Sequence, residues 1–444
     1  MARTANSKAK SLADKPAART LVLDVGAHSI KAGYASSHTN EVSSAATACH
    51  VIPNCIARST RDKRTYVGSQ LDDCQDFGEL AFRRPAEKGY IVNWEGEKAI
   101  WESSIFHDKE RNLACDPTET NLLLTEAPQA PATLQRHADE MVFEEFGFAS
   151  YGRVLAPVLP SYVYGSTSEP AECLLVIDVG HSHTTLTPLL SGRPLHAACR
   201  RLDIGGKTLT NQLKDHVSSR QFELQKEFFL VEQMKEDVCF VAESSQIFAD
   251  SLERCWKGGL KDPRKLDTSI VVEYVLPDYE AIKRGFVREH DPSMSRRKRL
   301  GLDGVQREDF VVLGNERFTV PELLFTPSDL GMQSPGIAGM VLDCLGAIPS
   351  GMWQVFLANI VVVGATSKLP GLVNRLEADL RETVDERLLV KVKHADDPVK
   401  CIWQGGAHIA SSEALMKQFC VSKAEYAEHG DAWVRGVFAG RTAR

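Results

Sequence analysis

Two stretches of the chain share one pattern of hydrophobic and polar positions. Residues 21–35 read LVLDVGAHSIKAGYA, and residues 174–188 read LLVIDVGHSHTTLTP. In both, an apolar run ends in Asp-Val-Gly, and a short polar turn leads into a second run of strand-like residues. We therefore predict a strand–turn–strand hairpin in each stretch. The two aspartates, Asp24 and Asp178, lie about one domain length apart, which favours two similar domains in tandem over a solenoid of short repeats.

Two such hairpins, facing each other across a cleft, would aim two carboxylates and two sets of turn amides at one place. Turn amides bind anions and carboxylates hold a hydrated cation, so this place suits nucleotide phosphates with magnesium. A single Asp-Val-Gly is an ordinary turn, whereas the second copy favours the nucleotide hypothesis. Residues 360–371, IVVVGATSKLPG, add a buried strand that enters a Gly-Ala-Thr turn, with Pro370 placed to begin a helix.

The pattern between these stretches predicts further elements. Residues 94–106 and 134–146 carry apolar residues at helical spacing, and residues 121–124 read as a short buried strand. Residues 51–68 are polar, with basic residues closely grouped, and this pattern predicts an exposed loop.

Length and composition set the outer limits. At 444 residues the chain exceeds what a single core usually serves, so two large lobes are expected. The chain has no apolar run long enough for a membrane helix and no apolar core of a secretory signal, so we expect a protein of the cytosol or nucleus without membrane contact. A formal net charge of −7 argues against general affinity for nucleic acid, although residues 1–19 predict a disordered basic tail.

Cysteine usage agrees with that compartment. The eleven cysteines are scattered singly, and no two of them form a Cys-x-x-Cys pair. This spacing favours free, mostly buried thiols in a reducing environment and argues against a zinc module.

A series of strings along the chain occurs in an order that resembles actin and the actin-related proteins. The strings are YVG at 66–68, NW at 93–94, LLLTEAP at 122–128, RLDIGGKTLT at 201–210, MKEDVCFV at 234–241, LGNERFTVPELLFTPSDLGM at 313–332 and IWQGG at 402–406. The resemblance covers nearly everything after residue 20. It implies the α/β fold shared by actin, Hsp70 and hexokinase, in which two lobes with duplicated cores enclose a nucleotide cleft.

The same resemblance implies a division of the chain into a tail, two lobes and a returning segment. The expected parts are a disordered basic tail at 1–19, a first lobe at 20–163 with a shortened loop at 52–66, a second lobe at 164–400 with an insertion at 277–308, and a segment at 401–444 that returns to the first lobe.

Carried over position by position, the resemblance implies a site for ATP or ADP with Mg²⁺. Two phosphate turns, an adenosine-lining pair and a turn beneath the nucleotide would form it. The implied cofactor-binding residues are, in that order, Asp24, Gly26 and Lys31, then Asp178 and Gly180, then Lys235 and Glu236, and finally Gly364, Ala365 and Thr366.

The departures from the family pattern fall on the phosphate turns. A serine and a glycine of the first turn are replaced by Ala27 and His28, which removes a hydroxyl and puts an imidazole where backbone would approach phosphate. An aspartate and a glycine of the second turn are replaced by His181 and Ser182. The binding frame is therefore only partly retained.

The catalytic positions depart further. In actin a glutamine orients the attacking water, and the alignment places Ala156 there, while the histidine that helps order this water falls on Thr185. Loss of a water-orienting group costs on the order of 10²-fold or more in phosphoryl transfer. We therefore expect no enzyme and no catalytic residue. The alternative is an actin-fold ATP-binding protein with slow ATPase or small-molecule kinase activity.

His181 and His183 stand two positions apart and could in principle bind a metal. No cysteine or carboxylate cluster accompanies them in the sequence. A packed or solvent-facing pair is favoured, and no metal site is predicted.

Two segments bear on partners. The loop by which actin docks into the next subunit of a filament is shortened at 52–66, so self-assembly should be lost. The strand-like runs 269–276 and 309–313, which meet through a brief turn in actin, are separated here by the insertion. Partner docking is favoured for the insertion, with a solvated loop or direct DNA contact as alternatives. Its candidate partner-binding residues are Lys283, Arg284, Arg296, Arg297, Lys298 and Arg299.

Within the family the chain most resembles a nuclear branch. The reasons are the lost catalytic groups, MKEDVCFV, the run VEYVLPDY at 272–279 and the insertion that follows it. This resemblance implies a scaffold subunit of a multi-subunit chromatin remodeller of the Swr type, which exchanges a histone variant. It further implies a small zinc-finger subunit and a RuvB-like ATPase ring as partners, nucleosome or DNA contact only indirectly, and a location in the nucleus and also the cytoplasm.

Overall fold

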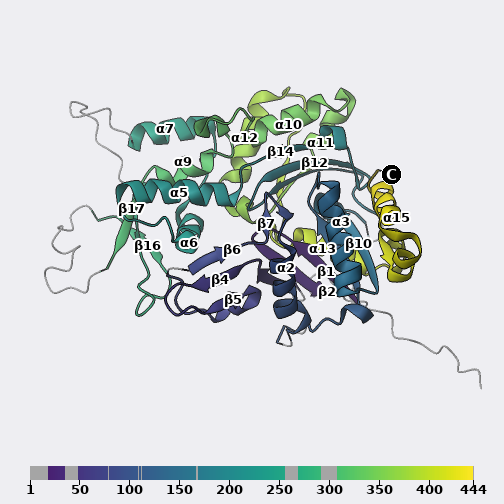
Figure 1. The fold of residues 1–444 in the computed structure, drawn as a ribbon. Coiled ribbons are helices and arrows are strands. Elements are labelled where there is room, and N and C mark those ends of the chain that lie inside the picture. Colours follow the sequence, from purple (N-terminus) through teal and green to yellow (C-terminus); the bar gives the residue numbers. More distant parts are fainter. Residues whose placement is uncertain are drawn as a thin grey trace, which may run out of the picture.

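Two β-sheets with helices around them form the body of the protein in the computed structural model (Figure 1). The structure describes residues 19–35, 49–78, 80–108, 110–111, 113–166, 169–255, 269–291 and 308–443. The basic tail, apart from Arg19, therefore lies outside the described residues.

The first sheet has the strand order β20-β10-β9-β1-β2-β3. Its first hairpin is the one predicted from the DVG pattern: β1 and β2 pair antiparallel, with Asp24 opposite Lys31. β1 then pairs parallel with β9, and β9 with β10. The strands are β1 (Thr20–Val25), β2 (Ser29–Tyr34), β3 (His50–Pro53), β9 (Asn121–Glu126), β10 (Ser150–Leu155) and β20 (Cys420–Ser422).

The second sheet repeats this arrangement. β11 and β12 form the second predicted hairpin, with Asp178 opposite Thr185, and β11 pairs parallel with β18, which pairs parallel with β19. The same pairing in both sheets confirms the predicted α/β fold with duplicated cores. The strands are β11 (Cys173–Val179), β12 (Thr184–Leu190), β13 (Arg193–Pro194), β14 (Arg200–Leu202), β18 (Ile360–Val363) and β19 (Val392–His394).

Helices surround both sheets. In the first half, α2 and α3 appear where helical spacing predicted them, and each ends in a π-helical turn, Glu102–Phe106 after α2 and Met141–Phe146 after α3. The helices are α2 (Trp94–Trp101), α3 (Ala132–Glu140), α4 (Pro160–Val163), α5 (Gly206–Arg220), α6 (Phe228–Val238), α7 (Ser245–Cys255), α9 (Glu316–Glu322), α10 (Ile337–Gly346), α11 (Trp353–Leu357), α12 (Leu372–Thr383), α13 (Cys401–Ala410), α14 (Glu413–Phe419) and α15 (Lys423–Ala443). None of the helices in the described part of the chain is both long and apolar enough to cross a membrane.

Short 3₁₀ turns connect several of these elements. They span Gly68–Asp73, Pro117–Glu119, Ala156–Val158, His196–Ala198, Pro327–Leu330, Ser350–Met352 and Ala365–Lys368. A two-stranded ribbon, β7 (Ala86–Glu87) with β8 (Tyr90–Ile91), stands beside the first sheet.

The C-terminal segment packs against elements from the start of the chain. β20 forms the outer strand of the first sheet beside β10, and α15 lies next to α3 and β10 (Figure 1). Trp403 of α13 is fully buried and donates its indole N–H to the carbonyl oxygen of Val22 at 3.0 Å. On the same helix, a side chain on Gly405 would place its Cβ 2.0 Å from the carbonyl oxygen of Leu159, so α13 can approach this closely only with glycine there. One apolar cluster joins both sheets through this helix.

The loop predicted at 51–68 is largely wrong. The segment forms strands that build a small sheet of order β5-β4-β6, with β4 (Ile56–Ser59), β5 (Thr65–Val67) and β6 (Leu80–Arg83). Cys55 and Ala57 are buried there with Leu71, Cys74 and Leu80 in a separate apolar cluster. The polar composition misled the prediction because only every second residue of these strands faces that cluster.

The insertion contains a turn and a strand in its described part, so it is more than a bare connector. β16 (Phe286–Glu289) pairs with β15 (Val272–Val275), which also pairs with β17 (Phe310–Leu313). Asp278 shapes the preceding turn, since its Oδ1 accepts backbone N–H bonds from residues 280, 281 and 282. The candidate partner residues Arg296, Arg297, Lys298 and Arg299 lie outside the described residues.

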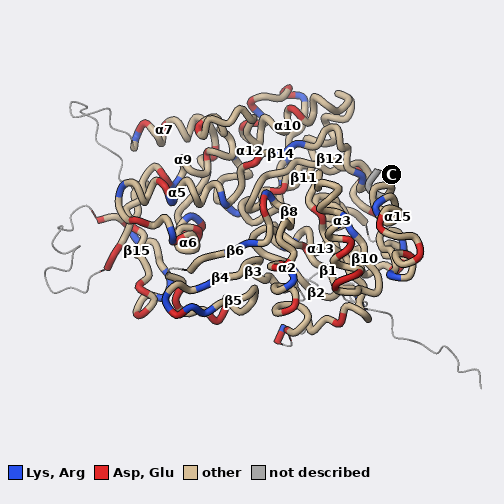
Figure 2. The backbone as a smooth tube through the Cα atoms, in the orientation of Figure 1, with Lys and Arg blue, Asp and Glu red and all other residues tan. Residues whose placement is uncertain are grey.

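Charges of both signs are mixed along the described chain, and basic segments are visible near β4 and β5 (Figure 2). Acids neutralise part of that basic group: Arg61 lies 2.8 Å from Asp76, and Arg64 lies 3.3 Å from Asp62. The eleven cysteines all fall within the described residues, and all are free thiols.

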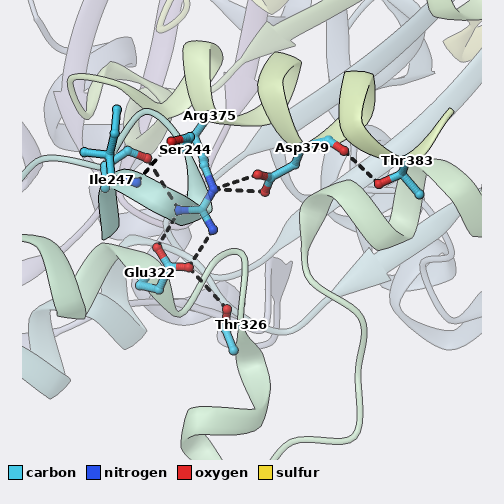
Figure 3. Close-up of polar contacts among 8 residues, drawn as sticks. Ser244, Ile247, Glu322, Thr326, Arg375, Asp379 and Thr383 are labelled. Carbon is cyan, nitrogen blue, oxygen red and sulfur yellow. Dashed lines mark hydrogen bonds and ion pairs between the residues drawn. The ribbon is translucent and has the colours of Figure 1, made fainter. Parts of the chain in front are cut away.

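A buried ion network fastens α12 to α9 in the second lobe (Figure 3). Arg375 donates to both carboxylate oxygens of Glu322, at 2.7 and 2.8 Å, and to Asp379 one turn further along its own helix, at 2.8 Å. Glu322 also accepts the hydroxyl of Thr326 at 3.2 Å. Fork-shaped pairing of this kind holds the two helices in one orientation.

Candidate functional site

The turns of the two hairpins meet between the sheets. Asp24 is buried near the end of β1, and Asp178 stands at the matching position of β11. Burial and the nearby charge of Asp24 raise the pKa of Asp178 to about 6, against a smaller opposing effect of Lys31. Two carboxylates and a lysine from different hairpins therefore share one region, as the sequence pattern indicated.

Asp24 is held in place by neighbours on both sides. The hydroxyl of Thr125, on β9, donates to Asp24 Oδ1 at 3.0 Å and accepts the backbone N–H of Val25 at 3.1 Å. Lys31 Nζ lies 3.7 Å from Asp24 Oδ2 and 3.5 Å from the carbonyl oxygen of Ser29. The lysine that the resemblance assigned to phosphate is thus directed at the aspartate and the turn.

The glycines of the two turns take equivalent positions. Gly26 donates its N–H to the carbonyl of Ser29 at 3.2 Å, and Gly180 donates to the carbonyl of His183 at 3.0 Å. The two turns are therefore closed by equivalent backbone hydrogen bonds.

The turn after β18 packs against the turn of the second hairpin. Gly364 has φ of +92°, and a Cβ there would lie 2.5 Å from Asp178 Oδ1, so only glycine fits. Thr366 donates its hydroxyl to the carbonyl of Gly180 at 2.9 Å, while Ala365 between them is exposed. The structure thus brings Gly364 and Thr366 to the second turn.

Lys235 and Glu236, the pair that the resemblance assigned to the adenosine, differ in their surroundings. Lys235 is buried on α6, and its Nζ donates to Thr210 Oγ1 at 3.0 Å and to the carbonyl of Gly206 at 3.4 Å. Glu236, the next residue of the helix, is exposed. Lys235 therefore contacts the start of α5, which lies beside the second turn.

A cluster that the sequence did not reveal crosses from one turn to the other. His28 Nε2 lies 3.0 Å from Glu232 Oε2, and His181 Nδ1 lies 3.5 Å from Glu232 Oε1. The two imidazole rings stand 5.0 Å apart. Arg84 donates to the carbonyl of His28 at 3.0 Å, and its other nitrogen lies 3.9 Å from Glu232. The two histidines that replace family residues are thus joined by one carboxylate from α6.

The charges in this cluster follow from its surroundings. Burial alone would raise the pKa of Glu232, but the hydrogen bond and charge of His28, with Lys235 and His181, lower this pKa to about 2. Burial and the neighbouring His28 hold the pKa of His181 well below its usual value. Near neutral pH the cluster therefore contains an ionised carboxylate and a neutral His181.

His181 and His183 are both packed against other segments, one of the two arrangements that the sequence favoured, but they face different segments. His183 turns towards Gly89, whose position leaves no room for a Cβ beside the imidazole. Burial and Arg201 lower the pKa of His183 to about 4. His181 instead faces Glu232, and among the described residues its Nε2 has no hydrogen-bond partner.

A second buried network supports the first turn from behind. Asn54 donates its amide to the carbonyl of Gly26 at 3.0 Å and its backbone N–H to the carbonyl of His28 at 2.8 Å. Glu97, fully buried on α2, accepts the indole N–H of Trp101 at 2.8 Å. Burial raises the pKa of Glu97 to about 7, with hydrogen bonds from Trp101 and Asn54 opposing the shift. Asn54 Oδ1 and Glu97 Oε2 are both buried and have no hydrogen-bond partner in the described structure.

The positions aligned with actin's water-orienting residues lack that chemistry. Ala156 begins a 3₁₀ turn and has no polar side-chain atom. Thr185 is buried in β12, opposite Asp178.

Aromatic contacts join the small sheet to α6. Phe77, next to the small sheet, stacks on Phe229 of α6 with ring centroids 4.2 Å apart. Phe82 of β6 lies 6.0 Å from the same ring. Lys283 in the insertion donates to Gln75 at 3.3 Å. The guanidinium of Arg284, another candidate partner residue, lies 3.1 Å from Asp237.

Sequence reasoning missed Glu232, Arg84 and Glu97. One signal was available for Glu232, because it stands three residues before Lys235 and so shares a face of α6 with it. Arg84 and Glu97 join the site through contacts between distant segments, which local patterns do not record.

Comparisons with known proteins agree with this architecture. The family model described as Actin matches residues 15–438. A Neurospora crassa protein named Actin-related protein 6 is 45% identical, with 97% of each chain covered. An Aspergillus fumigatus protein named Actin-like protein arp6 is 43% identical over 99% of this chain and 98% of its own. A Drosophila melanogaster protein named Actin-related protein 6 is 35% identical over 92% and 97%. The resemblance to the actin-related proteins is thereby confirmed.

Proposed function

This chain belongs to the actin family, and we propose that it serves as a non-catalytic scaffold subunit of a nuclear chromatin remodeller of the Swr type. In this role it supports ATP-dependent exchange of a histone variant, and hence transcription regulation, while another subunit hydrolyses ATP. It acts in the nucleus and is also present in the cytoplasm. The similarity to relatives named actin-related protein 6 over nearly the whole chain supports this assignment.

The observation that carries the non-catalytic part is the position of Glu232. Its ionised carboxylate contacts His28 and His181, the residues at which backbone would approach phosphate in the family. An anion there repels a triphosphate. Together with Ala156 at the water-orienting position, this argues against efficient hydrolysis.

The nucleotide that the family implies fits these residues only in part. Asp24, Asp178 and the glycine turns suit a hydrated Mg²⁺ and phosphates. The carboxylate of Glu232, in its position between the two turns, does not suit bound phosphates. We therefore propose that ATP or ADP binds only when Glu232 moves away from the turns.

Partner contacts are proposed on the insertion. Its described edge strand β16 exposes Phe286 and Val287, with relative exposures of 45% and 38%. An edge strand with apolar side chains is suited to pairing with another chain. We propose that this strand, with Lys283, Arg284 and the basic run 296–299, docks the RuvB-like ATPase ring. A small zinc-finger subunit binds elsewhere, nucleosome or DNA contact is indirect, and no self-filament forms.

A second candidate is an ATP-binding protein with slow ATPase or small-molecule kinase activity. The observation that favours it is the retained frame around the second turn, where Gly364 and Thr366 contact Asp178 and Gly180.

Two measurements test the proposal. The tagged full-length chain, isolated from nuclear extract, should retain a remodeller with its zinc-finger subunit and ring ATPase by mass spectrometry. Replacement of the four basic residues 296–299 by serine should weaken retention of the RuvB-like ATPase ring. The control double variant Lys63→Ser with Arg64→Ser, which changes another exposed basic pair, should retain the ring normally. Phosphate release by the isolated protein should be negligible. Turnover on the order of one per second, the lower range for kinases, would establish the enzyme instead.

A further inference from the structure

We propose that His28, His181 and Glu232 form a binding site for one divalent transition-metal ion, with Zn²⁺ preferred, that joins the two lobes. This site is independent of the scaffold role proposed above.

The geometry brings three ligand-type groups together. One nitrogen from each histidine and one oxygen of Glu232 all lie within 4.8 Å of one another. Donor atoms that each sit about 2.0–2.2 Å from a zinc ion stand roughly 3.2–3.6 Å apart in a tetrahedral site. His28 Nε2 lies 3.0 Å from Glu232 Oε2, and His181 Nδ1 lies 3.5 Å from Glu232 Oε1, so each histidine is near this spacing from a different oxygen of the carboxylate. Small side-chain movements must bring the two imidazole nitrogens to this spacing from each other and from the oxygen that binds.

A second observation points to a ligand. The His181 side chain is only 9% exposed, and its Nε2 has no hydrogen-bond partner among the described residues. A buried ring nitrogen left in this state is costly. The His181 nitrogen nearest Glu232 is Nδ1, so an ion bound between His28 and Glu232 takes either this nitrogen, leaving Nε2 to water, or Nε2 after the ring turns.

The donor set decides the class of ion. Two imidazole nitrogens and one carboxylate oxygen suit zinc and its transition-metal neighbours, whereas magnesium and calcium prefer oxygen ligands throughout. Arg84, 3.9 Å from Glu232, carries a positive charge that weakens attraction for any cation. Its bond to the carbonyl of His28 at 3.0 Å holds the guanidinium on the backbone side of that residue. Three protein ligands leave a fourth position for water.

The ligands come from three separate elements. His28 lies in the β1–β2 turn, His181 in the β11–β12 turn and Glu232 on α6. An ion bound by all three therefore fixes the first hairpin against the second lobe. It also occupies space beside both turns.

The test uses the full-length protein stripped with EDTA and dialysed. Calorimetric titration with ZnCl₂ should show one saturable site per chain and a raised melting temperature. His28→Gln, His181→Gln and Glu232→Gln should each weaken zinc binding by at least about tenfold, as loss of a metal-site group typically does. His183→Gln, a matched change in the same turn, should leave it unchanged.

Cobalt provides a readout on the unaltered chain, so the result does not depend on the variants folding. Co²⁺ should give visible absorption of a four-coordinate site with nitrogen and oxygen ligands. Any one of three results would overturn the site: no stoichiometric binding, equal binding by the three ligand variants, or the near-ultraviolet charge-transfer band of thiolate ligation from the cysteines.

Discussion

His28 Nε2 and Glu232 Oε2 lie 3.0 Å apart although they belong to different lobes. The contact places a negative charge beside the turns that the family uses for phosphate. A histidine that appears as a mere departure in sequence is therefore part of a cross-cleft interaction. Its partner is a helix residue more than two hundred positions away.

The first prediction concerns nucleotide affinity. With EDTA-stripped protein and excess Mg²⁺, Glu232→Gln should bind ATP about tenfold more tightly than the unaltered chain. Removal of one like charge close to phosphate is worth on the order of 1–2 kcal/mol in a partly solvated site. The ATP concentration at half-maximal thermal shift provides the measurement.

Glu223→Gln, which removes an exposed carboxylate outside the cleft, should not change that concentration. Equal or weaker ATP binding by the Glu232 variant would show that this carboxylate does not hinder phosphate.

Glu97 should make stability depend on pH. Its folded pKa of about 7 lies above the ordinary value of 4.5, so the folded state holds this proton more tightly. The stabilisation is fully present below pH 4.5 and is lost as pH rises through 7. Over pH 5 to 8 the group should account for a loss of roughly 2–3 kcal/mol in the free energy of unfolding. Urea denaturation at several pH values measures it.

Glu97→Gln should flatten this dependence, because an amide does not titrate in this range and its oxygen can still accept the indole N–H of Trp101. Glu95→Gln, an exposed neighbour on α2, is the matched control and should keep the slope of the unaltered protein. An unchanged slope in the Glu97 variant would contradict the assignment.

Arg375 should be one of the more sensitive positions of the second lobe. Arg375→Met leaves Glu322 buried without its bidentate partner, which should cost about 3–5 kcal/mol of unfolding free energy. Denaturant melts provide the measurement. Arg387→Met, at a largely exposed arginine, should change stability by less than about 0.5 kcal/mol.

Adding Glu322→Gln to Arg375→Met should restore part of the loss, because the unpaired charge is removed. Additive losses in the double variant would mean that the charge of Glu322 is not the source of the cost.

The stack of Phe77 on Phe229 should couple the small sheet to α6. A cycle of Phe77→Ala, Phe229→Ala and the double variant should give a coupling of about 1 kcal/mol in unfolding free energy, the usual range for aromatic pairs. Amide hydrogen exchange in β4, β5 and β6 should become faster in each single variant. Zero coupling with unchanged exchange would show that this stack does not join the small sheet to α6 in solution.

Local pattern was sufficient for the hairpins. An apolar run that ends in a glycine turn predicts strand pairing without any other part of the chain, and both copies are present. The duplicated sheets followed from that repeat. Residues 51–68 were misread because short strands over a small cluster carry too few apolar residues to dominate their composition.

The site was harder to predict from the sequence, because its residues are far apart along the chain. His28 and His181 were visible as departures, but the group that joins them comes from α6, and nothing in either turn indicates that helix. His181 and His183 stand two positions apart in the turn, but the sequence does not show which way each ring points, and the two rings face different segments.

The pairing of β20 with β10, and the bond from Trp403 to Val22, bear on how the protein is made. The N-terminal half of the chain leaves the ribosome long before β20 and Trp403 have been synthesised. Until then β10 presents a bare edge, and the sheet around β1 lacks a large part of its covering. We expect the nascent chain to remain open until residues 401–422 have emerged, and therefore to depend on cellular holdases up to that point.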